Sequence, residues 1–67
     1  MTAIDSLMLD AKQAILDEHH RRFNMFHQEG RVEETLRQFQ VTMNCASDIL
    51  EDSLRLLNEA INQHDNV

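Results

Sequence analysis

The sequence lacks proline, tryptophan and tyrosine, and it contains one glycine and one cysteine. Because proline and glycine are the residues that interrupt helices, their scarcity predicts helix along nearly all of the 67 residues. A single cysteine, Cys45, excludes an internal disulfide. The lone thiol and the absence of a basic, apolar leader in residues 1–16 predict a reducing, cytoplasmic location. No apolar run is long enough to span a bilayer, so membrane insertion is not expected.

Positive charge is also scarce, since 6 Lys and Arg residues face 12 Asp and Glu residues and the formal net charge is -6. An acidic chain repels phosphate backbones, so nucleic-acid binding is not expected. One local basic patch stays possible around the middle of the chain. Its arginines are Arg21, Arg22, Arg31 and Arg37.

Residues that could carry chemistry are few and poorly spaced. A helical metal site needs ligands three or four residues apart on facing helices, but the sequence has no Glu-x-x-His, and residues 32–63 have no histidine. Cys45 falls on the polar face of the second amphipathic segment, without a histidine nearby. We therefore expect no enzyme, no metal and no cofactor. His19 falls inside an apolar stripe, near Met43, where a packed ring with a satisfied nitrogen is favoured over a pH-sensitive contact.

The hydrophobic pattern predicts an all-α fold, an antiparallel two-helix hairpin in one domain of residues 1–67. The predicted elements are a helix over about 3–28, a turn over about 29–31 and a helix over about 32–63. Thr2 is a plausible N-cap with Asp5 in the first turn. Gly30 stands at the one natural break and suits a residue with positive φ after the first helix. The apolar line of the first helix is Ile4, Met8, Ala11, Ile15 and Phe26.

The second segment follows a heptad pattern, which predicts the seam that packs against the first helix. The predicted core positions are Val32, Leu36, Phe39, Met43, Ala46, Leu50, Ser53, Leu57 and Ala60. Two other layouts remain open. A break within residues 44–48 would give three helices, and a glycine tolerated at position 30 would give one long helix.

The two flanks of this heptad seam turn apolar after residue 48, which makes a stripe wider than one facing helix can cover. Such a surface on a soluble protein usually means association. The end of the hairpin away from the turn is therefore the predicted partner-binding site, filled by another helical protein or by a second copy in a homodimeric four-helix bundle. The predicted contact residues are Leu7, Leu9, Leu16, Ile49, Leu54, Leu56 and Ile61.

A helix, a tight glycine turn and a longer amphipathic helix in a chain of this length resemble the small co-chaperones of bacterial type III secretion needle subunits. The resemblance covers Ile4–Gln63. It rests on the amphipathic start Leu7–Leu16, on Gly30, on Phe39-Gln40 and on the apolar run Ile49–Ile61. It implies a cytoplasmic hairpin that pairs with a tetratricopeptide-like chaperone, and a pair that keeps the needle subunit from polymerising early.

Two neighbouring classes fit the same pattern less well. Needle subunits are themselves short helical hairpins, but they usually carry a proline in the turn, and this chain has none. The alternative from a different class is a homodimeric four-helix bundle with a regulatory role, either structural or RNA-binding. RNA binding would need a basic face, which only the four arginines could supply.

Overall fold

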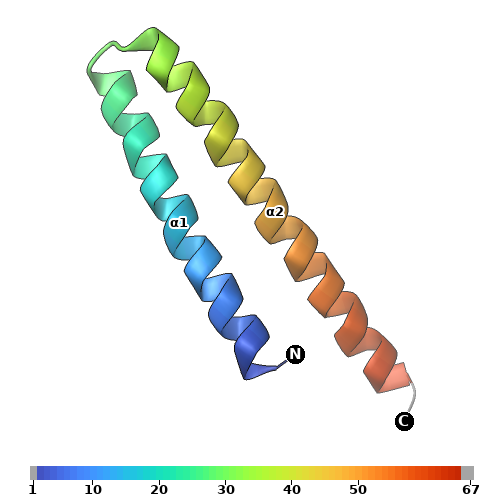
Figure 1. Ribbon diagram of the computed structural model, residues 1–67. Coiled ribbons are helices and arrows are strands. Elements are labelled where there is room, and N and C mark those ends of the chain that lie inside the picture. The colour runs from blue at the N-terminus through green and yellow to red at the C-terminus, as the bar shows by residue number, and fades with distance from the viewer. Residues whose placement is uncertain (1, 66–67) are drawn as a thin grey trace.

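The computed structural model describes residues 2–65, which form two antiparallel helices lying side by side along their length (Figure 1). Helix α1 spans Ala3–Gln28 and helix α2 spans Val32–Asp65. The molecule is long and thin, with principal extents of 55, 17 and 11 Å. The predicted helical hairpin is confirmed. Helix α2 runs unbroken through residues 44–48, so the three-helix layout is wrong, and the turn at residues 29–31 excludes one continuous helix.

Helix α1 begins with a reciprocal cap between Thr2 and Asp5. The Thr2 hydroxyl accepts a hydrogen bond from the Asp5 backbone N–H at 3.2 Å, and the Thr2 backbone N–H donates to the Asp5 carboxylate at 3.3 Å. These bonds satisfy amide hydrogens that have no partner inside the helix. The hydrogen bonds from Thr2 also hold the pKa of Asp5 below its ordinary value. The predicted N-cap is therefore confirmed.

The turn is closed by a Schellman motif around Gly30. The Gly30 N–H donates to the His27 carbonyl at 3.1 Å, and the Arg31 N–H donates to the Phe26 carbonyl at 3.0 Å. Gly30 has a φ of 71°, a left-handed conformation that costs little only without a Cβ. The Arg31 guanidinium lies 4.9 Å from the Phe26 ring centre and 3.3 Å from Glu34. A single glycine thus reverses the chain.

The two helices meet along a row of partly covered residues, which we call the hairpin seam. It consists of Leu9, Lys12, Leu16, His19, Phe23 and Phe26 on α1, and of Thr35, Gln38, Thr42, Cys45, Ile49, Asp52 and Leu56 on α2. Among residues 2–63, the hydrophobic side chain that is fully covered is that of Leu56, which is 4% exposed. The hairpin seam therefore mixes apolar and polar side chains instead of forming a continuous apolar core.

Most of the heptad residues that the sequence predicted as the core do not face α1. Seven of the nine follow a hairpin-seam residue by one position, as Leu36 follows Thr35 and Leu50 follows Ile49, which turns them about 100° away around the helix. The Phe39 ring still reaches α1, with its centre 6.0 Å from that of Phe23. Leu36 and Leu50 are 64% and 63% exposed. Four members of the predicted apolar line of α1, namely Ile4, Met8, Ala11 and Ile15, are likewise exposed, whereas Phe26 lies in the hairpin seam. The heptad phase was correct, but the face assigned to the core was wrong.

The physical reason lies in the polar pairs that cross between the helices. Lys12 on α1 contacts both Asp48 and Asp52 on α2. His19 on α1 contacts Gln38 on α2. These pairs form only when the polar flank of α2 turns toward α1, and Ile49 and Leu56 on the same flank then supply the apolar contact. A prediction from the spacing of apolar residues does not take these polar pairs into account, so it assigned the wrong side of α2 to the core.

Candidate docking surface

One side of α2 carries a continuous row of apolar and small side chains, which we call the α2 stripe; only the Phe39 ring has an aromatic neighbour on α1, Phe23, among the described residues. It comprises Val32, Leu36, Phe39, Met43, Ala46, Leu50, Ser53, Leu57 and Ala60. The spacing alternates strictly between four and three residues, which is the pattern of a coiled-coil helix that faces another helix. Ala46 is half-buried and the other members are exposed. None carries a charge, so the surface is suited to burial against another apolar surface.

The α2 stripe widens toward the end of the hairpin away from the turn. Leu54 and Ile61 lie beside it on the flank away from α1, and both are exposed. On the flank toward α1, a shallow apolar hollow of about 350 Å³ is lined by Leu9, Ser53, Leu56, Leu57 and Ala60. A ridge of side chains from another helix could fit there.

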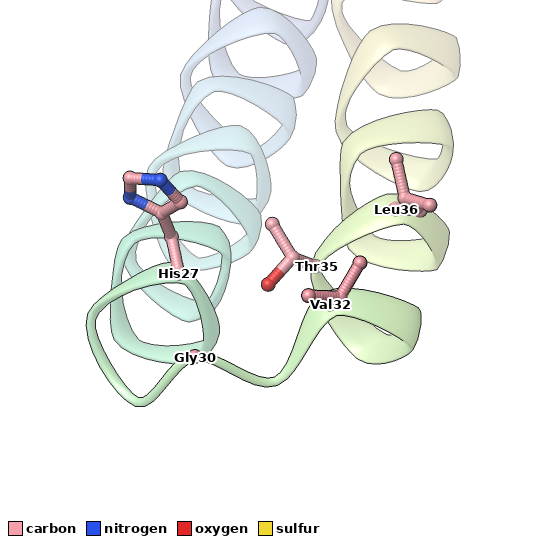
Figure 2. A pocket seen from close by; sticks show the side chains of 5 residues that line it. All are labelled: His27, Gly30, Val32, Thr35 and Leu36. Carbon is pink, nitrogen blue, oxygen red and sulfur yellow. The ribbon is translucent and has the colours of Figure 1, made fainter.

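The stripe also extends to the turn, where Figure 2 shows a second hollow. Its lining residues are His27, Gly30, Val32, Thr35 and Leu36, and its volume is about 290 Å³. Val32 lies on the first turn of α2 and Leu36 one turn further along, while His27 comes from the last turn of α1. This hollow is open and has no cluster of catalytic side chains, so we interpret it as the near end of the α2 stripe.

The hairpin seam explains why the apolar residues are left outside. Lys12 has its Nζ 2.9 Å from the Asp48 carboxylate and also hydrogen-bonds Asp52. The bond from Asp52 raises the pKa of Lys12, and the bond from Lys12 lowers the pKa of Asp52. The amide nitrogen of Gln38 donates to Nδ1 of His19 at 3.0 Å, so the expected satisfied ring nitrogen is present. Because these side chains are partly exposed, such pairs add little to stability, but they form in one alignment of the two helices.

The structure places four of the seven predicted contact residues in the hairpin seam and three on the exposed surface. Leu9, Leu16 and Ile49 are half-buried in the hairpin seam and Leu56 is buried there, so the hairpin itself covers them. The three that stay exposed are Leu7, Leu54 and Ile61. The sequence missed the α2 stripe as a docking surface because it had assigned the same residues to the core. The position of Lys12, in phase with Leu9 and Leu16, was the signal that the facing side is polar.

A second, smaller apolar area lies on α1 and is called the α1 patch here: Ile4, Leu7, Met8 and Ile15. Ile4, Met8 and Ile15 each precede an inward-facing residue by one position, whereas α2-stripe residues follow one. Both helices are right-handed, but they run in opposite directions, so a step of one residue forward turns toward the same side of the hairpin on each. A step forward on α2 and a step backward on α1 therefore lead to opposite sides, and the two areas lie on opposite sides of the hairpin. The patch ends where Glu18 and Arg22 take the equivalent positions.

The four arginines do not form a basic patch. Arg21 and Arg22 both bond Glu18, at 2.6 and 3.1 Å, and the bond from Arg21 contributes most to lowering the pKa of Glu18 to about 2. Arg31 pairs with Glu34, and Arg37 lies 3.5 Å from Glu33. Each positive charge therefore has an acidic neighbour, and the surface near the turn is mixed in sign.

Within residues 2–65, no three His, Cys, Asp or Glu side chains gather closely enough to hold a metal ion. The Cys45 thiol is half-buried in the hairpin seam, where the sequence had placed it on an exposed polar face. Neither described helix combines the length and the apolar character needed to cross a bilayer. Comparison of the chain with protein-family models, curated proteins and solved structures gives no match.

Proposed function

We propose that this protein is a protein-binding module, a small helical co-chaperone or assembly factor that works by packing its exposed apolar face against helices of another protein. The observation that carries the proposal is the α2 stripe, an uncharged row with strict heptad spacing from Val32 to Ala60 that the hairpin leaves uncovered. An amphipathic helix that docks through residues spaced three and four apart is a recurring mode of protein recognition.

The resemblance to the co-chaperones of type III secretion needle subunits supports a specific version of this proposal. The partner is then a tetratricopeptide-like chaperone, whose stacked helices provide an extended concave surface that suits a long helix. The pair would hold a needle subunit unassembled in the cytoplasm. The hairpin form and the longer, more amphipathic second helix are the features of this chain that agree with that role.

The test is co-expression with a tetratricopeptide-like chaperone and a needle subunit from the same genome. We expect the three proteins to co-purify, and the needle subunit to stay unpolymerised in their presence. Leu54→Asp should remove the association, because an unpaired carboxylate is costly to bury. Asn58→Asp adds the same charge at an exposed position of the same helix and should leave binding unchanged. Equal binding by both variants, each with wild-type helicity, would overturn the role of this face.

A further inference from the structure

We propose that the α2 stripe is occupied by the same stripe of a second copy of this chain, with the two α2 helices antiparallel and each α1 on the outside. This inference rests on the proposed role of the α2 stripe as a docking surface and names its occupant in the isolated protein. Three observations carry it, namely the surface area, the sizes of the side chains along the stripe and the distribution of charge.

The first observation is an excess of exposed surface. The chain of 7.9 kDa exposes 5315 Å². A compact folded monomer of that mass exposes about 4,400 Å². The excess of about 900 Å² is close to the 800 Å² or so that each partner contributes to a stable protein–protein interface. One additional interface of ordinary size would therefore bring the chain to the exposure of a self-sufficient protein.

The second observation is the order of large and small residues in the α2 stripe. One of its two alternating rows is uniformly large: Leu36, Met43, Leu50 and Leu57. The other row becomes small along the helix: Val32, Phe39, Ala46, Ser53 and Ala60. A parallel pair would stack each row on itself and would leave small residues facing small residues in three layers, at Ala46, Ser53 and Ala60, which alternate with leucine layers.

An antiparallel pair sets the first row against the second instead. Every small side chain of one copy then faces a leucine or a methionine of the other, which fills the interface evenly. The alignment with Leu57 opposite Phe39 of the second copy satisfies this rule, since it sets Ala46 against Leu50, Ser53 against Met43 and Ala60 against Leu36. In it, Ala46 lies near the twofold axis.

The third observation is electrostatic. The net charge of -6 opposes self-association, but the α2 stripe has no charged member. The positions of α1 that look to the same side of the hairpin include Asp10, Asp17 and His20, which are polar and exposed. These side chains do not suit an apolar bundle interior, so α1 stays outside the contact. The dimer is thus a two-helix α2 contact and not the closed four-helix bundle that the sequence suggested.

The mass of the protein in solution tests the self-association. Sedimentation equilibrium of the wild type should give twice the chain mass, and the thermal midpoint should rise with protein concentration, since association stabilises the folded form. Leu50→Glu should raise the dissociation constant by about 100-fold or more, because two unpaired carboxylates enter the contact. Asn44→Glu, an exposed change on the outward face, is the control and should stay dimeric. A wild-type monomer whose midpoint does not depend on concentration would overturn the proposal.

The distance between spin labels tests the orientation. With Cys45 replaced by serine and a label on a cysteine at the exposed position 58, an antiparallel pair with Leu57 opposite Phe39 separates the labels by about 30 Å, given a rise of 1.5 Å per residue. A parallel pair would hold them within about 20 Å, because packed helices lie 8–10 Å apart. The short distance would overturn the antiparallel arrangement. If the free protein is monomeric but Leu54→Asp still abolishes chaperone binding, the self-pairing is wrong and the proposed function stands. If the protein is a dimer but binds no chaperone, the self-pairing stands and the proposed function is wrong.

Discussion

The ammonium group of Lys12 on α1 lies 2.9 Å from the carboxylate of Asp48 on α2, and it also bonds Asp52 one helical turn further on. Because this lysine is in phase with Leu9 and Leu16, it fixes which side of α2 turns toward α1. The same setting leaves the α2 stripe in solvent. The position of this lysine is thus one determinant, beside the contact of His19 with Gln38, of both the register of the hairpin and its exposed face.

The first prediction concerns pH. The pKa of Asp52 is lowered by its bond from Lys12, so the stabilisation is present above its ordinary value of 3.8 and is lost as the pH falls through the lower folded value. The pKa of Lys12 is raised, so its stabilisation is present below 10.5 and is lost as the pH rises through the higher folded value. Thermal melts followed by circular dichroism should show a plateau between these limits. In Lys12→Met, the loss of stability that this pair causes at the acidic and the alkaline end of the plateau should disappear. A variant with the same pH dependence as the wild type would show that the pair does not cause it.

The second prediction concerns the turn. Gly30→Ala should lower the free energy of unfolding by about 1–2 kcal/mol, because a Cβ disfavours a left-handed backbone. No atom lies within 4 Å of the position that the new Cβ would take, so the cost is conformational and not steric crowding. Chemical denaturation measures it. Gln28→Ala, at the exposed last residue of α1, is the control and should change stability little.

The third prediction concerns the start of α1. Thr2→Ala removes the hydroxyl that accepts from the Asp5 N–H and should cost about 1 kcal/mol, the usual value for losing an N-cap. Because the bonds from Thr2 lower the pKa of Asp5, their stabilisation holds at neutral pH and declines in acid. Hydrogen exchange of the first-turn amides should accelerate in the variant. Protection equal to the wild type would show that the cap contributes nothing.

The fourth prediction separates two adjacent leucines of α2. Leu56 is 4% exposed in the hairpin seam, and Leu57 is 56% exposed in the α2 stripe. Leu56→Ala should destabilise the hairpin by about 2–5 kcal/mol. Leu57→Ala should weaken dimerisation and, in dilute monomer, change stability by less than about 0.5 kcal/mol. Denaturation and sedimentation of both variants distinguish the effects, and an equal loss of hairpin stability would mean that the two faces are wrongly assigned.

The architecture was predictable from local features. Gly30 as the lone glycine, Thr2 three residues before Asp5, and unbroken apolar spacing around them defined the hairpin and the positions of its ends. The heptad phase of α2 was also readable, because spacing alone determines which residues share a face.

The orientation of that face was not predictable by the same reasoning. Whether Leu50 or Ile49 faces α1 depends on contacts between distant residues, such as Lys12 with Asp52 and His19 with Gln38. A hydrophobic pattern treats these polar residues as surface. The predicted contact residues were affected in the same way. Leu54 and Ile61 were assigned correctly to the exposed side, whereas Leu56 was not.

The one-residue offset between the hairpin seam and the α2 stripe has a consequence for mutational tolerance. The hairpin seam and the α2 stripe occupy neighbouring heptad positions on α2. Most of the helix circumference therefore belongs to, or adjoins, one of these two contact faces. Three positions in every seven belong to neither set, and one of the three also adjoins neither around the helix; it recurs at Arg37, Asn44, Glu51 and Asn58. In a saturation scan selected for function, these four should accept nearly any helix-compatible residue. Neutral substitutions in α2 would then be concentrated on this one line along the helix.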